Sequence, residues 1–177
     1  MKSLLDLLRD LMLFRRGPQD LPFSTSLLAG ACVVGFALDA FVASRFQQMA
    51  DAVPRVAFSL AALLLLPWIA LKLAKLEARY AQTATALVAT SAMFTLLTVP
   101  VLLGVGKLPT DPKDLTAAQA LLGWFSLLLV GWQLAVRGHI LRHALDLPMR
   151  LGVLIAVVFF AVELIVAVIV FGQGQGS

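Results

Sequence analysis

Long apolar runs dominate this chain, and its charged residues are gathered in short clusters between them. A charged side chain in the hydrocarbon core of a bilayer costs several kcal/mol, so this clustering is expected if each run crosses a membrane. The composition agrees: 60% of the residues are hydrophobic and 14% are charged, against about 25% charged in soluble domains. The pattern predicts an integral membrane protein and excludes an ordinary soluble domain.

Five of the runs are long enough to cross a bilayer, which takes about 20 residues of helix. The segments between them carry Pro, Gly or charged residues, which suit loops. We therefore predict an all-α fold, a polytopic membrane helix bundle of about five transmembrane helices, at about residues 24–44, 56–73, 81–105, 117–136 and 151–171.

The segment 1–22 precedes this five-helix transmembrane domain, which covers 23–171. Between residues 1 and 14, apolar and charged side chains separate onto two faces of a helix. The helix is too short to span a bilayer, so we predict a short amphipathic helix in the cytoplasmic interface, followed by a linker. Packing of its apolar face against a partner protein is the alternative. We expect residues 172–177 to form a flexible external tail.

Lys and Arg are distributed unevenly between the two predicted sides of the membrane. With the N-terminus inside, ten of the 14 basic residues fall on the cytoplasmic side, as the positive-inside rule requires. This predicts a cytoplasmic N-terminus and an external C-terminus, and the Ala/Leu-rich composition points to a bacterial inner membrane. The basic residues that we expect to contact lipid phosphates are Arg15, Arg16, Lys72, Lys75, Arg79, Arg137, Arg142 and Arg150.

Two acidic residues, Asp39 and Glu163, fall inside predicted spans. An intramembrane carboxylate is by default a functional-site hypothesis. Both lie on stripes of small residues, which let helices approach closely, so we expect both to point into the bundle at similar depth. Together they are candidates for a proton or cation site, because two close carboxylates in a low dielectric cannot both ionise cheaply. The alternative is that each is protonated or hydrogen-bonded and serves packing.

Hydroxyl and amide side chains in neighbouring spans are candidate partners for these acids. Ser91, Thr95 and Thr98 share one face of the third span, and Gln133 lies in the fourth. Such groups usually bond to helix carbonyls or to an adjacent helix. Helix association is therefore the preferred interpretation, and the lining of a polar pathway is the alternative.

His139, His143 and Asp146 form an HxxxHxxD pattern that would place them on one helical face. Metal ligands can have this spacing, but the arginines in the same segment oppose a cation, so we expect lipid contact and no metal. The chain has no nucleophile elbow, HExxH motif or Gly-rich phosphate loop. We predict no catalytic residue and no cofactor. The basic residues form no single stripe, so no nucleic-acid partner is expected.

The stretch Gly131–His139, with the sequence GWQLAVRGH, is followed by a last span. In this respect, and in its span layout, the chain resembles bacterial Yip1-domain proteins. The shared layout is the expected cytoplasmic N-terminal segment, five closely spaced spans and a short external C-terminus. The acidic-aromatic DLYGP-type motif of the eukaryotic family is not present, so no small-GTPase role and no catalytic residue is carried over.

These observations favour a non-enzymatic membrane protein that acts as an accessory, scaffold or regulatory subunit. Its expected partners are membrane lipids and either another protein or further copies of itself. The first alternative is a small transporter or channel subunit that uses Asp39 and Glu163. The second is a lipid-acting membrane enzyme with His139, His143 and Asp146 as a cytoplasmic site.

Overall fold

Helices make up nearly all of the computed structural model, which describes residues 3–45, 49–105 and 115–172. Those residues contain no strand, which confirms the predicted all-α fold. A short helix, α1 (Leu4–Met12), comes first. The five helices that are long and apolar enough to cross a membrane are α2 (Thr25–Ala43), α3 (Met49–Leu73), α4 (Tyr80–Val105), α5 (Ala117–Leu145) and α6 (Met149–Phe171).

Local sequence signals explain where several of these helices begin and end. The side chain of Ser24 accepts a backbone hydrogen bond at the start of α2, and Thr116 and Gln119 form a capping box at the start of α5. Both arrangements satisfy N–H groups that have no partner within the helix. Asp146 adopts a left-handed conformation (φ 54°) and ends α5 shortly before Pro148.

The largest departure from the predicted spans concerns α5. The fourth span was expected to end at 136, because Arg137 opens a basic segment, but the helix continues to Leu145. No Pro interrupts that stretch, and the first stop is the left-handed residue Asp146. At 1.5 Å per residue, the 29 residues of α5 extend about 43 Å, beyond the roughly 30 Å of a hydrocarbon core. Arg137 therefore lies in the interior of a helix that extends beyond the predicted span. Similarly, α3 begins at Met49, ahead of the expected 56.

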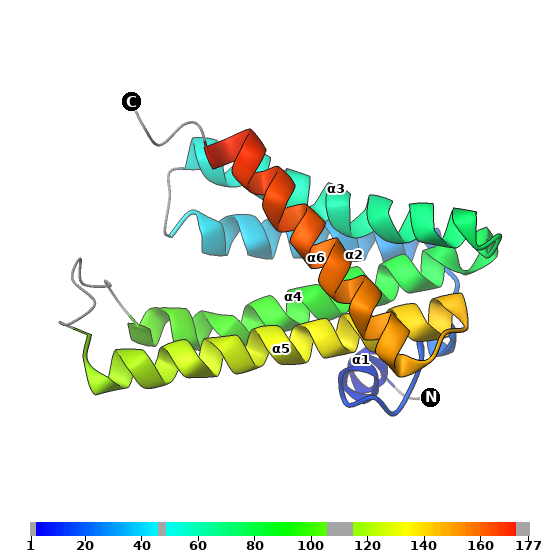
Figure 1. The fold of residues 1–177 in the computed structure, drawn as a ribbon, viewed down its shortest axis with the longest axis horizontal. Coiled ribbons are helices and arrows are strands. Elements are labelled where there is room, and N and C mark those ends of the chain that lie inside the picture. Colours follow the sequence, from blue (N-terminus) through cyan, green and yellow to red (C-terminus); the bar gives the residue numbers. More distant parts are fainter. Residues whose placement is uncertain (1–2, 46–48, 106–114, 173–177) are drawn as a thin grey trace.

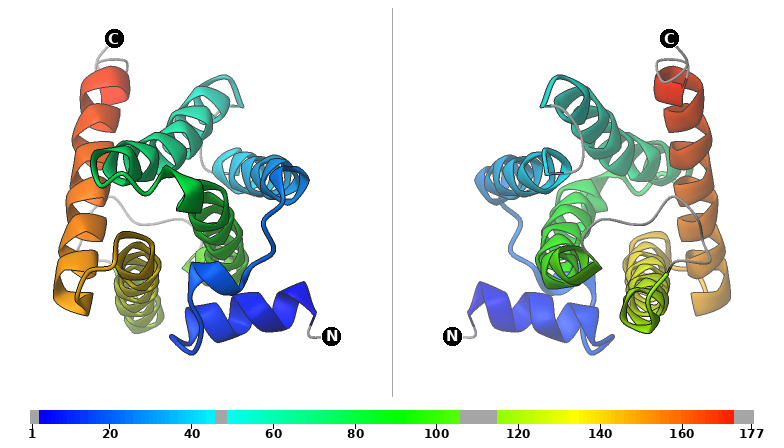
Figure 2. Two further views of the ribbon diagram at one scale, coloured as in Figure 1. Left: turned by 90° about the vertical axis from the view of Figure 1, so that its right-hand side faces the viewer. Right: turned by 90° about the vertical axis from the view of Figure 1, so that its left-hand side faces the viewer.

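Helix α4 lies at the centre of the bundle (Figure 2). Helices α2 and α3 run along one side, α5 runs antiparallel to α4, and α6 crosses obliquely over α5 and α3 (Figure 1). Many side chains of α4 are buried, whereas α2, α5 and α6 present large apolar side chains outward, such as Val33, Leu128 and Ile169. Apolar surface of this extent on helices of this length suits contact with lipid.

Helix α1 lies against the outside of the bundle, beside α4 and α5 and across their direction (Figure 2). A capping box between Ser3 and Asp6 starts it, and the hydrogen bonds from Ser3 lower the pKa of Asp6. Its apolar side chains Leu8, Leu11 and Met12 are at most 5% exposed. They form one apolar cluster with residues of α4 and α5.

Three side chains of α4 and α5 also hold the N-terminal segment by donating hydrogen bonds to its backbone carbonyls. These bonds run from Trp132 to Met12 (3.1 Å), from His139 to Arg16 (2.7 Å) and from Gln82 to Leu21 (2.7 Å). Much of the apolar side that was expected at the membrane interface is therefore covered by the protein's own bundle. Leu4 and Leu5 remain exposed.

Docking of α1 leads to a first prediction. Leu11→Ala is expected to weaken the docking by about 2–5 kcal/mol, because Leu11 is fully buried and its removal leaves a cavity. Hydrogen exchange of the α1 amides should then accelerate, as measured by mass spectrometry on the full-length protein. Leu5→Ala is the matched control, since Leu5 is 68% exposed on the same helix. Equal exchange in the two variants would contradict the docked arrangement.

Candidate functional site

Glu163 is held by partners from two other helices. The hydroxyl of Ser59 on α3 donates a hydrogen bond to one carboxylate oxygen, and Arg137 Nη1 on α5 lies 3.8 Å from the other. The side chains of Arg137 and Glu163 are only 16% and 18% exposed. An uncompensated charge in so sheltered a place is strongly destabilising, so each of the two needs the other.

Arg137 also connects Glu163 to the second intramembrane acid. Its guanidinium interacts electrostatically with both Glu163 and Asp39. Its Nε atom is buried and has no hydrogen-bond partner among the described residues. We expected Arg137 to contact lipid phosphates, but the structure places it inside the bundle. A sequence signal for this placement exists, because the residues that follow it, Gly-His-Ile-Leu at 138–141, are mostly apolar and contain no helix-breaking Pro.

Asp39 on α2 faces α4. Thr95 Oγ1 donates a hydrogen bond of 2.6 Å to Asp39 Oδ1, a short distance that is typical of a hydroxyl bound to a carboxylate. Thr98 instead donates to a carbonyl of its own helix (2.8 Å), and the amide nitrogen of Gln133 donates to Ser91 Oγ (3.4 Å). Of the four polar residues predicted as partners of the acids, Thr95 is therefore hydrogen-bonded to an acid in the described structure. Ser91 and Gln133 instead bond to each other and join α4 to α5.

Each of the five long helices contributes one side chain to this arrangement, which we call the polar core. Its members, in chain order, are Asp39, Ser59, Thr95, Arg137 and Glu163. Hydrogen bonds and ion pairs are stronger in a low dielectric than in water. Within the polar core, Asp39 and Thr95 therefore tie α2 to α4, and Ser59, Arg137 and Glu163 tie α3, α5 and α6 together. Sequence reasoning found three of the members and placed Arg137 elsewhere, whereas Ser59 was missed because a lone Ser in an apolar run carries no distinctive pattern.

Two cavities of different size adjoin the polar core. The cavity beside Arg137 and Glu163 has a volume of about 20 Å³, close to the space that one water molecule needs. It is also lined by Pro67, which has no N–H to offer the carbonyl of Leu63 in the preceding turn. The cavity beside Asp39 is larger, about 230 Å³, and is open. Asp39 thus lines a much larger cavity than Glu163 does.

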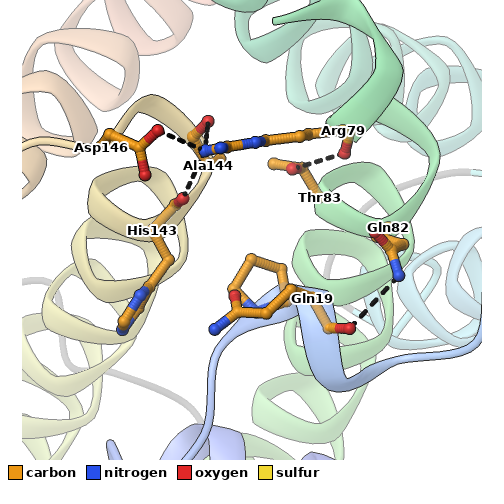
Figure 3. Close-up of a pocket in the computed structure, with 8 residues that line it drawn as sticks. Gln19, Arg79, Gln82, Thr83, His143, Ala144 and Asp146 are labelled. Carbon is orange, nitrogen blue, oxygen red and sulfur yellow. Dashed lines mark hydrogen bonds and ion pairs between the residues drawn. The ribbon is translucent and has the colours of Figure 1, made fainter.

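A third pocket, of about 360 Å³, lies where the N-terminal segment meets α4 and α5 (Figure 3). Arg79 donates to Asp146 (2.7 Å) and to the carbonyls of His143 and Ala144 (3.3 Å each) along one edge of it. These carbonyls belong to the last turn of α5 and have no donor within the helix. Gln19 lies on the opposite side (Figure 3). Arg79, one of the expected lipid contacts, thus fastens the start of α4 to the end of α5.

The two histidines of the HxxxHxxD pattern lie edge to face, with ring centroids 4.7 Å apart. His139 is 2% exposed and donates to the carbonyl of Arg16, whereas Asp146 pairs with Arg79. The pattern therefore serves contacts with the N-terminal segment and with the residues just before α4. Within the described ranges, no three His, Cys, Asp or Glu side chains come together in a way that could hold a metal ion.

The remaining basic candidates lie at the end of the bundle that carries α1 and the α3–α4 and α5–α6 connections (Figure 1). Arg16 pairs with Asp10 (3.4 Å), and the guanidinium of Arg142 donates to His143 (3.0 Å). Exposed cations at one end of a membrane bundle are placed to reach lipid headgroups. The exposed ones are Arg15, Lys72, Lys75 and Arg150.

Family models, curated proteins and solved structures offer no match to this chain. The geometry of the bundle alone therefore carries the functional argument. The resemblance of Gly131–His139 to Yip1-domain proteins stays a prediction.

Proposed function

We propose that this chain is a non-enzymatic accessory, scaffold or regulatory subunit of a larger assembly in a bacterial inner membrane. The observation that carries the proposal is that both intramembrane carboxylates are bound by side chains of other spans. Glu163 is engaged by Ser59 and Arg137, and Asp39 accepts a hydrogen bond from Thr95. Polar side chains that bind one another between spans act first as packing contacts, which suits a protein whose role is to present a stable surface to its partners.

The outer surface supports the same proposal. Large exposed apolar side chains on α2, α5 and α6 offer area to lipids and to a further membrane protein or a second copy of the chain. The cluster of cations beside α1 favours a cytoplasmic N-terminus and an external C-terminus, because cytoplasmic segments are enriched in Lys and Arg.

Affinity purification tests the proposal. The full-length protein with a C-terminal tag is extracted in mild detergent, and co-purifying proteins are quantified by mass spectrometry against an untagged strain. The accessory role predicts a partner in near-stoichiometric amount. Recovery of the chain alone, as a monomer or a homo-oligomer, would contradict it.

The second candidate is a small transporter or channel subunit, and the open cavity of about 230 Å³ beside Asp39 is the observation that favours it. This function predicts that Asp39→Asn and Glu163→Gln abolish ion or proton flux in vesicles while the protein remains folded and abundant. The accessory role predicts instead that both variants, where folded, capture the same partner as the wild type.

A further inference from the structure

Oxygen atoms that can accept hydrogen bonds or bind a cation line the cavity beside Asp39. The hydroxyl protons of Thr95 and Thr98 are committed to Asp39 and to a carbonyl of α4, and the amide nitrogen of Gln133 donates to Ser91. The atoms that remain to serve a ligand are the two hydroxyl oxygens, the amide oxygen of Gln133 and the second carboxylate oxygen of Asp39. Such a set suits a cation and offers little to an anion.

The charges around this cavity do not balance. Asp39 and Glu163 are two carboxylates, and Arg137 supplies the guanidinium that interacts with both of them among the described residues. Arg137 forms its ion pair with Glu163, whereas Asp39 receives a hydrogen bond from a neutral hydroxyl and interacts with Arg137 without a contact. A net negative charge in a low dielectric is costly. One further positive charge near Asp39 would complete the balance.

We propose that this cavity binds one monovalent metal cation of the sodium or potassium class, with Asp39, Thr95, Thr98 and Gln133 supplying the oxygen ligands. Oxygen dipoles replace the hydration shell of such ions in other membrane sites. A divalent ion would exceed the surplus negative charge, and calcium sites generally use several carboxylates where this cavity has one. The volume of about 230 Å³ leaves room for retained water. The proposal does not depend on the accessory role, because a subunit of an assembly can hold a structural ion.

The test uses the purified full-length protein at constant ionic strength, with choline chloride exchanged for sodium or potassium chloride. We expect a saturable rise in Tm with at least one of the two metal ions, and a calorimetric stoichiometry of one ion per chain. Asp39→Asn should remove the dependence on metal ions, because it removes the charged ligand and keeps the shape of the side chain.

A pair of threonine variants of α4 provides the matched comparison. Thr98→Val removes one proposed ligand and should weaken the affinity for the ion at least tenfold. Thr90→Val removes a hydroxyl that is likewise bonded to its own helix (2.7 Å to the carbonyl of Ala86) but does not line the cavity, so the affinity should be unchanged. If Asp39→Asn fails to fold, the comparison of Thr98→Val with Thr90→Val still tests whether the cavity binds the ion.

Three results would overturn the proposal. The first is a Tm that is the same in choline, sodium and potassium. The second is an equal metal response in the wild type and Asp39→Asn, or in Thr98→Val and Thr90→Val. The third is a stabilisation that follows pH alone, which would assign the missing positive charge to a proton.

Discussion

Arg137→Met is expected to lower the free energy of unfolding by about 3–5 kcal/mol, the usual cost of removing one partner of a buried ion pair. Methionine keeps most of the volume and the flexibility of the arginine stem, so the loss reports chiefly on charge. Without Arg137, two carboxylates stay inside the bundle with only the hydroxyls of Ser59 and Thr95 as hydrogen-bond donors in the polar core. Unfolding in mixed micelles with increasing SDS measures the change.

Two further variants separate the ion pair from other effects of the substitution. Arg150→Met removes a cation that is exposed near the start of α6, and it should change the free energy of unfolding by less than about 1 kcal/mol. The double variant Arg137→Met/Glu163→Gln removes both charges of the pair and should regain much of the lost stability. A double variant no more stable than Arg137→Met alone would show that Arg137 does not act through Glu163.

The positions of the five long helices follow from the sequence because hydrophobic length is a local property. A run such as 151–171 must be about as long as the bilayer is thick, whatever its neighbours are, and α6 covers Met149–Phe171. Helix α5 continues beyond the predicted end of the fourth span at 136, and this has a related reason. A charge was taken to mark the edge of the membrane, although a charge inside a bundle is tolerated once a partner from another helix meets it.

The sequence could not predict which side chains from distant segments contact one another. The amphipathic pattern of residues 1–14 predicts an apolar face but says nothing of what covers it, and here Leu87 and Ile140 belong to the covering cluster. Asp39 and Glu163 were candidates for a shared proton or cation site, but the sequence did not indicate that Arg137 interacts with both. The ion pair of Arg137 with Glu163 depends on how α5 and α6 cross. Crossing geometry is a tertiary property that no single helix encodes.

The crossing of α5 and α6 depends on two glycines. A Cβ atom added at Gly138 would lie 2.6 Å from the Cα atom of Val153, and one added at Gly152 would lie 2.8 Å from Cβ of Arg142 and still closer to the carbonyl oxygen of Gly138. These neighbours are mostly backbone atoms, which cannot move aside as a side chain would. Small residues at such contacts let two helices approach closely.

Gly138→Ala and Gly152→Ala are therefore expected to destabilise the protein by about 1–3 kcal/mol each, as overpacking does. Gly138→Leu should leave little folded protein. Because the shift of α6 would also displace Glu163 from Arg137, either alanine variant should weaken the coupling between those two residues in a double-mutant cycle. The measurements are unfolding in mixed micelles and the fraction of monodisperse protein after extraction.

The control is Gly131→Ala on the same helix, since a Cβ atom at Gly131 meets nothing within 4 Å. Alanine favours a helix over glycine by about 1 kcal/mol in water, so this variant should be neutral or slightly more stable. The same chemical change thus has opposite expected signs about two helical turns apart. Equal effects of Gly131→Ala and Gly138→Ala would mean that helix propensity and not the α5–α6 contact governs the response. That result would contradict the close α5–α6 contact, and with it the helix arrangement that places Arg137 beside Glu163.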